Sequence, residues 1–431
     1  MQQAFFTISQ VADMLSMSKE TLRRWDANGK LKSVRHPANN YRVYPAESLM
    51  QFEALGCVIN PDLVQASTEQ AEHDFHVVEL FAGAGGLAIG LEQAGLRCAM
   101  LNELNKDACN TLRQNRPHWD VREGDVAKQD FSEFQGKIDV VTGGFPCQAF
   151  SYAGRKLGFE DARGTLFFEF ARAVKEIQPL ICVGENVRGL LTHDNGRTLQ
   201  GMISILDELG YDVVHPRVLK AIFHRVPQKR ERLLIVGLRR DAGLNFDFPQ
   251  PEKEIFNMRD ALKKGRLFDR DVAKSKGQSY PMRKKQIMEM VPPGGYWRDL
   301  PLLVQKEYMM KSFYLGGGKT GMARRLAWDE PSLTLTCNPA QKQTERCHPE
   351  ETRPLEVREY ARIQTFPDAW QFAGSTSSQY KQIGNAVPVN LAQALGTSLV
   401  KTLNEYYRRH PGEVMPHAFE AAQRVLDLEP A

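Results

Sequence analysis

The sequence predicts an α/β protein with a doubly wound, parallel sheet, to which a basic irregular domain and a small helical module are added. Between His76 and about Arg240, short apolar runs alternate with helical patterns, which indicates βαβ units. The first run leads into a Gly-rich segment, residues 81–86, and then into an apolar helix, as in the first βα turn of a nucleotide-binding sheet. The predicted strands are His76–Leu80, Ala99–Leu101, Ile138–Thr142, Leu180–Val183 and Leu233–Val236.

The chain begins with a predicted helical module, residues 1–58. Apolar residues at helical spacing predict one helix over Ile8–Leu15, and a second helix and a short strand, Tyr41–Tyr44, follow it. This stretch resembles a winged helix-turn-helix of the MerR type, in which Arg23 and Arg24 of the second helix would contact DNA. A protein-docking or structural cap is the alternative interpretation.

A polar stretch without periodicity, residues 59–75, is predicted to link this module to the α/β domain, whose first part is residues 76–243. The composition changes over residues 244–351, where Pro and Gly interrupt the chain and Lys and Arg accumulate. A basic stretch indicates a nucleic-acid-binding domain, although a solvated charged face has the same composition. Helical patterns return over residues 352–410, which we expect to rejoin the α/β domain, and residues 411–431 form a tail.

The overall composition excludes several classes of protein. The 431 residues carry a net charge of only +4, and the seven cysteines include no CxxC pair, so neither a disulfide scaffold nor a zinc knuckle is expected. A mean hydropathy of −0.42 and the lack of a long apolar run exclude a membrane span. The first residues have neither a basic region nor an apolar core, so no signal peptide is expected. We therefore predict a cytoplasmic protein without a metal site.

The Gly-rich loop predicts a cofactor site. Gly83, Gly85 and Gly86 do not have the GxGxxG spacing that suits a dinucleotide pyrophosphate. Glu103 lies twenty residues after Gly83, at the end of the next apolar run, where an acid can bond ribose hydroxyls. Asp125 closes a third strand, where a carboxylate can take an adenine amino group. An adenosine-bearing cofactor without polyphosphate fits this set, and S-adenosylmethionine fits it best.

Three reactive groups lie beside predicted strands of the same domain. Cys147 follows the turn 143–146 at the end of one strand, and Glu185 lies at the end of the next. Arg230 and Arg232 lie just before the last strand. Such sheets bind ligands at the carboxyl ends of their strands, so we expect a thiol, a carboxyl group and an arginine cluster at one rim. A lone Cys is ordinarily an inert buried thiol, but the Gly and Pro residues of the turn favour a shaped loop.

Taken in order, these segments resemble the motif set of the DNA (cytosine-5) methyltransferases over roughly residues 76–405. The matching segments are Phe81–Gly86 as cofactor loop, Glu103 and Asp125 as ribose and adenine acids, Pro146-Cys147, Glu185-Asn186-Val187, Gln228-x-Arg230-x-Arg232, Arg353–Pro367 and Gln382–Pro388. One position departs from the family. Many members have an aromatic residue just after the ribose acid, where this chain has Leu104, so Phe81 is expected to do more of the stacking against adenine.

The resemblance implies a Rossmann-like S-adenosylmethionine-dependent methyltransferase domain and a smaller, irregular DNA target-recognition domain. The first would comprise residues 76–243 and 352–410, and the second residues 244–351. Double-stranded DNA would be the partner, bound by a monomer at the target site, with dimerisation through the helix-turn-helix module as a further option. The cofactor-binding residues implied are Phe81, Gly83, Gly85, Gly86, Glu103, Asp125, Val126, Pro146, Leu166, Asn385 and Val387.

The implied chemistry is covalent catalysis on cytosine. The Cys147 thiolate would add to carbon 6 and activate carbon 5, and Glu185, held protonated with a raised pKa, would donate to ring nitrogen 3. Arg232, with Arg230 beside it, would bond the base oxygen or anchor the loop. The base would flip out of the duplex, and residues 148–159 would close over it. The candidate DNA contacts are Ser151, Arg155, Arg23, Arg24, Gln341 and Lys342.

The resulting hypothesis is a sequence-specific DNA (cytosine-5-)-methyltransferase, the modification enzyme of a bacterial restriction-modification system. Methylation of RNA by the same chemistry is one alternative, which the basic domain and the helix-turn-helix disfavour. A DNA-binding regulator with an inactive core is the other, which the complete set of reactive residues disfavours. The helix-turn-helix would also allow the enzyme to regulate its own promoter.

Overall fold

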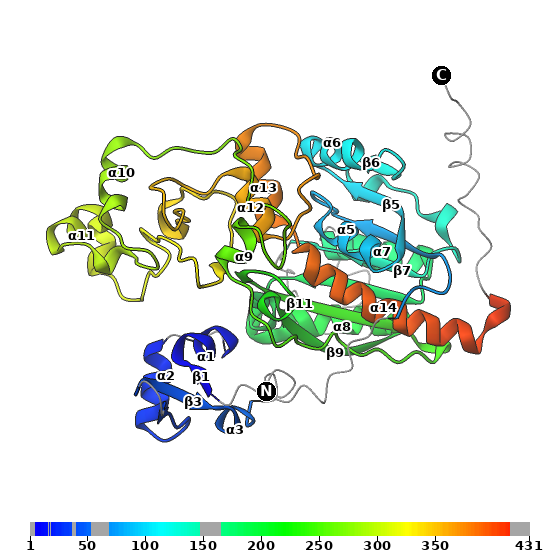
Figure 1. The fold of residues 1–431 in the computed structure, drawn as a ribbon. Coiled ribbons are helices and arrows are strands. Elements are labelled where there is room, and N and C mark those ends of the chain that lie inside the picture. Colours follow the sequence, from blue (N-terminus) through cyan, green and yellow to red (C-terminus); the bar gives the residue numbers. More distant parts are fainter. Residues whose placement is uncertain are drawn as a thin grey trace.

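The structure, a computed structural model, describes residues 5–15, 17, 19–36, 40–52, 69–146 and 165–413 (Figure 1). Its centre is a seven-stranded sheet with the strand order β6-β5-β4-β7-β8-β11-β9. The strands of this sheet are β4 (Phe75–Leu80), β5 (Leu96–Glu103), β6 (Val121–Glu123), β7 (Val140–Gly143), β8 (Ile181–Asn186), β9 (Tyr211–Lys220) and β11 (Glu231–Arg239). The five strands predicted from apolar runs are present, with ends that differ by a few residues, and β6 is the strand predicted just before Asp125. The α/β fold class is confirmed.

One strand runs against the predicted direction. The strands β4 to β8 are parallel, but β11 is antiparallel to both β8 and β9. The prediction of a fully parallel sheet is therefore wrong at β11. The connection between β9 and β11, residues 221–230, is too short for the crossover that parallel neighbours need, so these strands pair antiparallel. As a result the start of β11 lies beside the end of β8, with Leu233 opposite Asn186.

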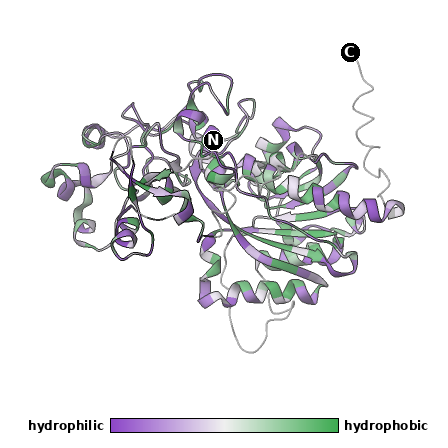
Figure 2. Cartoon of the chain, turned by 60° about the horizontal axis from the view of Figure 1, so that its bottom comes forward, coloured by the Kyte–Doolittle hydropathy of each residue, from purple (hydrophilic) through white to green (hydrophobic). Residues whose placement is uncertain are grey.

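Both faces of the sheet are buried under helices. Val77 and Val78, neighbours on β4, belong to different apolar cores, because successive side chains of a strand point to opposite faces. The helices α5 and α14 cover the Val77 face, and α7 and α8 cover the other. Figure 2 shows apolar residues concentrated on the strands between these layers. The helices of this domain are α5 (Gly86–Gln93), α6 (Lys106–Asn115), α7 (Leu166–Ile177), α8 (Arg197–Glu208), α12 (Val357–Ile363), α13 (Thr376–Asn385) and α14 (Val389–Arg409).

The last long helix, α14, packs along α5. The two helices approach so closely that a Cβ at Gly90 would lie 2.5 Å from the Val389 carbonyl oxygen. Further along α14, the Tyr407 hydroxyl donates to the buried Asp139 carboxylate at 2.6 Å. Asp139 lies just before β7, so this bond fastens the end of α14 to the amino edge of the sheet.

The stretch between residues 244 and 351, here called the basic region, lies largely apart from the sheet, on the left in Figure 1. It has little regular structure, as predicted, and it has an apolar core of its own that includes Met288 and Trp297. Ser332 lies opposite Gln228 in a short parallel pair that joins the basic region to the α/β domain. The elements of the basic region are α9 (Met258–Leu262), α10 (Met282–Glu289), α11 (Leu302–Met309) and β12 (Ser332–Leu333), and β12 pairs with β10 (Gln228–Lys229) of the α/β domain.

The N-terminal module contains the two predicted helices and the predicted strand. The Thr7 side chain caps the first helix: the Gln10 N–H donates to Thr7 Oγ1, and the Thr7 N–H donates to Gln10 Oε1. Two residues from beyond the module, Ile222 and Phe223, are buried in its core. The module thus lies beside the β9 edge of the sheet (Figure 1). Its elements are β1 (Phe5–Thr7), α1 (Ile8–Leu15), α2 (Lys19–Ala27), β2 (Val34–Arg35), β3 (Arg42–Pro45) and α3 (Ala46–Leu49).

Within the described ranges the chain has neither a helix that could span a membrane nor a cluster of metal ligands. None of the helices in these ranges is long and apolar enough to cross a membrane. In the same ranges, no three His, Cys, Asp or Glu side chains gather in a way that would hold a metal ion. The cysteines found there are free thiols: Cys98, Cys109, Cys182, Cys337 and Cys347.

His224, which follows Phe223, generates a prediction about stability and pH. It is buried, and burial lowers the pKa of its imidazole from 6.5 to about 4. Between these two pKa values the unfolded chain binds a proton that the folded protein does not, so the free energy of unfolding falls as the pH falls from 6.5 toward 4. We expect His224→Gln to remove about 2 kcal/mol of the stability lost between pH 7 and pH 4.5, measured by urea unfolding of both proteins. An unchanged pH dependence in the variant would show that His224 does not cause the loss.

Candidate active site

A cavity of about 670 Å³ opens at the rim where β4, β7 and β8 end and β11 begins. Its volume lies in the range of small-molecule sites. Besides the strand ends, two segments close it, residues 334–337 from the basic region and residues 384–387 at the end of α13. The predicted site residues that line it are Phe81, Gly83, Gly86, Glu103, Pro146, Glu185, Arg230, Arg232, Asn385 and Val387.

Four predicted cofactor residues do not line this cavity. Gly85 packs close to the Trp370 ring, Val126 is buried in the core, and Leu166 begins α7. Asp125 is exposed, and its side chain caps the short helix that follows it. Among the described residues these four therefore surround the site without forming its wall.

The predicted nucleophile and DNA contacts lie in three places. Three of them lie outside the described residues: Cys147, Ser151 and Arg155. Arg23 and Arg24 are exposed on α2. Gln341 is exposed as well, whereas Lys342 is half-buried, with its ammonium 5.2 Å from the centre of the Tyr308 ring.

The loop after β4 has a backbone that favours glycine. The angle φ is +56° at Gly83 and +82° at Gly85, and Phe81 is also in the left-handed region, at +59°. The Gly83 N–H donates to Glu103 Oε2 at 2.8 Å, and the Asn105 N–H donates to Glu103 Oε1 at 2.7 Å. Glu103 therefore fixes the loop, while each of its oxygens keeps a lone pair for a ligand.

Gly86 lets this loop meet the end of α13. A Cβ at Gly86 would overlap the Val387 carbonyl oxygen and would lie 3.1 Å from the Ala386 Cβ. Side chains do not approach a backbone atom that closely, so only glycine allows the two segments to touch. The contact brings Asn385 and Val387 to the wall of the cavity beside the Gly-rich loop.

Glu79 is a cavity residue that sequence reasoning missed. It lies on β4 and is 2% exposed, and its Oε2 has no hydrogen-bond partner among the described residues. Burial raises the pKa of Glu79 well above its usual range, and the nearby Glu103 and Glu185 add to this shift. The sequence held a signal for Glu79: it is an acid within an apolar run that predicts a strand buried on both faces. Acidic side chains are rarely buried at such positions unless they have a specific role.

Glu185 and Arg232 form an ion pair between β8 and β11. Their side chains are 12% and 10% exposed, so water screens the pair only weakly. Gly144 leaves room for the carboxylate, since a Cβ there would lie 3.1 Å from Glu185 Oε2. The neighbouring Asn186 donates from Nδ2 to the Phe145 carbonyl oxygen at 2.8 Å and thus holds the turn after β7. The carboxyl group and the arginine meet at one rim because β11 is antiparallel.

Arg230 is buried and joins three segments. Its guanidinium donates to the carbonyl oxygens of Leu335 at 3.2 Å, Gly384 at 2.9 Å and Asn385 at 3.3 Å. The last two carbonyls belong to the C-terminal end of α13, where unpaired carbonyl groups attract a cation. Burial lowers the pKa of Arg230, and the neighbouring Arg232 lowers it further. The arginines were predicted either to bond the base oxygen or to anchor the loop. These contacts suit Arg230 to anchoring.

Two buried amides that were not among the predicted site residues complete this junction. Gln228 accepts from the Leu335 N–H through Oε1 and donates from Nε2 to Gln364 Oε1, both at 2.8 Å. Gln364 in turn donates from Nε2 to the carbonyl oxygens of Ile383 at 2.8 Å and Ala386 at 3.2 Å. Both glutamines stand in segments that match the family motifs, which was the available signal. The amides hold the start of β11, the basic region and α13 in one register.

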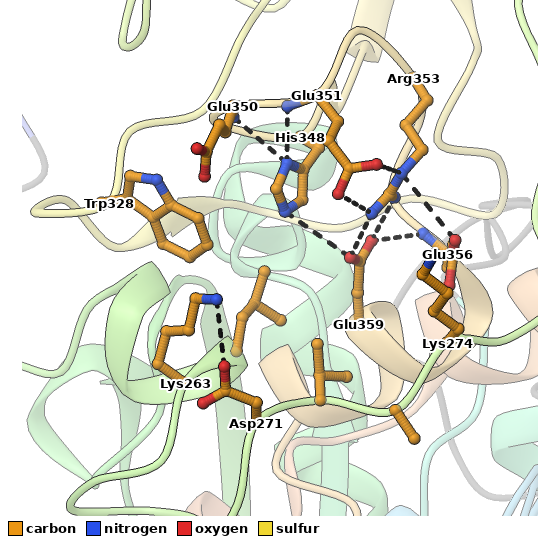
Figure 3. Close-up of a pocket in the computed structure, with 13 residues that line it drawn as sticks. Lys263, Asp271, Lys274, Trp328, His348, Glu350, Glu351, Arg353, Glu356 and Glu359 are labelled. Carbon is orange, nitrogen blue, oxygen red and sulfur yellow. Dashed lines mark hydrogen bonds and ion pairs between the residues drawn. The ribbon is translucent and has the colours of Figure 1, made fainter.

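A second, smaller pocket, of about 150 Å³, lies between α12 and the basic region, next to α9 (Figure 3). Arg353 donates from both terminal nitrogens to the Glu359 carboxylate, each at 2.8 Å, and His348 Nδ1 accepts from the N–H groups of Glu350 and Glu351. Burial lowers the pKa of His348, so the ring is neutral near pH 7, and its Nε2 lies 3.7 Å from Glu359. These internally paired groups fasten the end of the basic region to α12.

Comparisons with known proteins agree with this geometry. Residues 75–401 match the family model of the C-5 cytosine-specific DNA methylases, and residues 7–44 match that of the MerR family regulatory proteins. The chain is 62% identical over 409 residues to the Type II methyltransferase M.Eco47II of Escherichia coli, which covers 94% of this chain and 97% of that protein. It is 57% identical over 401 residues to the Type II methyltransferase M.PspPI of Psychrobacter sp. (strain TA137), with coverage of 93% and 96%.

The fold also has counterparts among solved structures. A DNA modification methyltransferase encoded within a prophage of E. coli aligns with a TM-score of 0.55 and 23% identity, covering 77% of this chain and all of that chain.

The cavity suits S-adenosylmethionine, the methyl donor of the family, because it combines a Gly-rich loop, the free lone pairs of Glu103 and sufficient volume. The chain therefore belongs to the C-5 cytosine-specific DNA methylase family: it is a DNA (cytosine-5-)-methyltransferase that uses S-adenosylmethionine and carries a MerR-like module at its N-terminus.

Proposed function

We propose that the protein methylates carbon 5 of one cytosine within a specific sequence of double-stranded DNA, as the modification enzyme of a restriction-modification system. Relatives at 62% and 57% identity are Type II methyltransferases, which supports this assignment. The observation that carries it is the single cavity in which the Gly-rich loop, the Glu185–Arg232 pair and the end of α13 meet. A methyl donor and a base must share one connected space, and the way this cavity joins these parts supports the proposal.

We assign the cofactor to the side of the cavity formed by the loop after β4 and the end of β5. Glu103 would accept the ribose hydroxyls on the lone pairs that the backbone N–H groups leave free. Phe81 would stack on adenine, because Leu104 is 71% exposed and does not line the cavity. Asn385 and Val387 would close this side from the end of α13. S-adenosylmethionine, when bound there, supplies the methyl group from its sulfonium.

The four predicted cofactor residues that do not line the cavity would support the cofactor side from outside its wall. The Gly124 N–H donates to the Glu103 carbonyl oxygen at 2.9 Å, which sets Asp125 just beyond the ribose acid, where an adenine amino group would reach it. Gly85 shapes the loop through its left-handed backbone. Val126 and Leu166 would supply apolar surface at the same end.

The base would occupy the side of Pro146, Glu185 and Arg232, with Cys147 next to it in the chain. The Cys147 thiolate forms a bond to carbon 6, ring electrons move toward nitrogen 3, and Glu185 donates a proton there. Carbon 5 would then take the methyl group, while the carbon–sulfur bond of the sulfonium breaks and its sulfur keeps the bonding electrons as a neutral thioether. A base removes the carbon 5 proton, the sulfur–carbon 6 bond breaks, and the proton on nitrogen 3 returns to Glu185.

The ion pair at Glu185 must loosen during this cycle. A cation stabilises the charged carboxylate, whereas proton donation requires the neutral acid. We infer that the base oxygen draws Arg232 away from Glu185 as the ring enters. A guanidinium has five N–H donors, and one terminal nitrogen of Arg232 already bonds the Glu231 carbonyl oxygen at 2.8 Å, so other N–H groups remain for the base oxygen. Arg230, held by three carbonyl groups, keeps the framework fixed meanwhile.

The depth of the site supports base flipping. Glu185 is only 12% exposed, so a cytosine stacked inside a duplex cannot reach it. Extruding the base costs roughly a few kcal/mol, which contacts inside the cavity offset. Residues 148–159, with Ser151 and Arg155, stay the predicted closing loop.

We propose residues 76–243 and 352–410 as the catalytic domain and residues 244–351 as the target-recognition domain. The separate apolar core of the basic region supports this division. Gln341, which is exposed, and Lys342 beside it are the proposed base contacts, since amides and ammonium groups read base edges in the major groove.

Bisulfite sequencing of plasmid DNA treated with the protein and S-adenosylmethionine tests the proposed function. We expect 5-methylcytosine at one position of a fixed sequence. A folded protein that binds S-adenosylmethionine but leaves duplex DNA unmethylated would overturn the proposal, and transfer to tRNA in a parallel assay would place the enzyme with RNA substrates instead.

Substitutions test the covalent mechanism. We expect Cys147→Ser to lose methyl transfer but to retain duplex DNA binding, because a serine hydroxyl is not ionised near neutral pH. We expect Glu185→Gln to lower kcat roughly 10²- to 10⁴-fold with S-adenosylmethionine binding unchanged. Labelled-methyl transfer and cofactor titration measure both, with Glu208→Gln, at the end of α8, as the matched control. An active Cys147→Ser enzyme would exclude the thiol adduct.

Substitution of Gly86 tests the assignment of the cofactor side. A Cβ there must push Val387 away from the loop, and overpacking of this kind costs about 1–3 kcal/mol. We expect Gly86→Ala to bind S-adenosylmethionine roughly 5- to 100-fold more weakly in calorimetric titration. Gly265→Ala is the control, because no atom lies within 4 Å of a Cβ at that position. Equal affinity of Gly86→Ala and wild type would separate the end of α13 from the cofactor.

A further inference from the structure

The N-terminal module is fastened to the α/β domain by a shared core. Ile222 and Phe223 are 2% and 4% exposed, and they pack in one apolar cluster with module residues that include Leu22 and Tyr44. A polar bond supports this contact, because the Lys220 ammonium donates to the Met14 carbonyl oxygen at 2.8 Å. The module therefore has a defined position on the enzyme.

This position is on the same rim as the cavity. Lys220 ends β9 and lies opposite Glu231, which begins β11. Glu231 pairs with Arg188 at 3.0 Å, just beyond the end of β8 that carries Glu185. Glu185 is level with Arg217 of β9, two strand spacings of about 4.8 Å away, and Lys220 lies three residues further along β9. Lys220, where the module is attached, is therefore roughly 14 Å from Glu185.

A second contact joins the module to the basic region. Lys19, at the start of α2, lies 3.6 Å from Glu330, and Glu330 also lies 4.0 Å from Lys229. The chain that follows Glu330 forms β12 and then reaches the cavity wall at Thr334. The helix α2 is thus adjacent both to the proposed target-recognition domain and to the segment that enters the active site.

The outward surface of the module is basic. On α2, Leu22 is buried whereas its neighbours Arg23 and Arg24 are exposed. The acids nearby are largely engaged, since Glu20 lies 3.6 Å from Arg23 and Asp26 bonds Ser33. The exposed cations of α2 and of the segment through β2 are Arg23, Arg24, Lys30, Lys32 and Arg35.

We propose that this basic surface binds the flank of the same duplex that is methylated, on one side of the target base and within about one helical turn of it. The proposal rests on the proposed function, because it needs DNA at the cavity. One turn of B-DNA spans about 34 Å, well beyond the roughly 14 Å between Glu185 and Lys220, where the module is attached, so a duplex that runs from the cavity toward β9 crosses the basic surface. Arginine and lysine bind phosphates whatever the sequence, and the shared core fixes where they do so.

Methylation of synthetic duplexes with unequal flanks tests this inference. The duplexes carry the site identified by bisulfite sequencing, with either flank cut to a few base pairs. We expect KM for DNA to rise at least fivefold when one flank is removed, and to change little when the other is removed, with kcat unchanged throughout. The variant Arg24→Glu should show the raised KM on every duplex, and should lower the dependence of binding on salt by about one phosphate contact.

A matched charge reversal separates this effect from a general loss of positive charge. Lys137 is exposed just before β7, a central strand, at the rim of the sheet opposite the cavity, so Lys137→Glu should keep the wild-type dependence on the flank. The inference is overturned if wild-type KM is indifferent to both flanks, or if Arg24→Glu matches wild type on the long duplex. Failure of the wild type to methylate any duplex would instead overturn the proposed function, and this inference with it.

Discussion

The reversed direction of β11 is the constraint on which the catalytic rim depends. A parallel β11 would place Arg230 and Arg232 at the amino edge of the sheet, roughly 30 Å from Glu185 at the rise of a nine-residue strand. The short connection from β9 prevents that arrangement and turns the strand around. Three contacts follow from this reversal of the chain. Arg232 pairs with Glu185, and Arg230 bonds the end of α13. The connection itself contributes Ile222 and Phe223 to the core of the N-terminal module.

Polar contacts between segments far apart in the chain complete the site. Apolar packing alone tolerates small shifts of register, whereas buried amides such as Gln228 and Gln364 lose a hydrogen bond with each shift, at about 1–3 kcal/mol for an unpaired group. The contact of Gly86 with Val387 adds a steric limit to the same junction. The cavity wall is thus held by directional hydrogen bonds and by the close contact that Gly86 permits. These contacts keep the proposed cofactor and base pockets at a fixed distance from each other.

The sequence revealed those features that depend on local pattern. Apolar runs located the strands, and the glycines of residues 81–86 located the loop, because burial and left-handed backbone leave a direct trace in residue type. The direction of β11 leaves no such trace, since an apolar run has the same pattern in either orientation. The position of Ile222 and Phe223 could not be predicted from the sequence either. They are ordinary core residues by type, and only the fold shows that they pack in the core of the N-terminal module.

Two arginines two residues apart on one chain segment have different partners, and this difference explains why both are arginines. Arg232 faces a carboxylate and needs spare N–H donors for a base oxygen, which a planar guanidinium has and an ammonium does not hold in a fixed direction. Arg230 faces three carbonyl oxygens from two segments, and a single lysine nitrogen cannot reach positions so far apart in direction. Burial lowers the pKa of Arg230, and the like charge of Arg232 lowers it further. The carbonyl end of α13 and the Glu185 carboxylate offset the cost of burying the two charges, from opposite sides. The pair is stable only when α13 and β8 are both in place, which couples closure of the cavity wall to the position of the proposed proton donor.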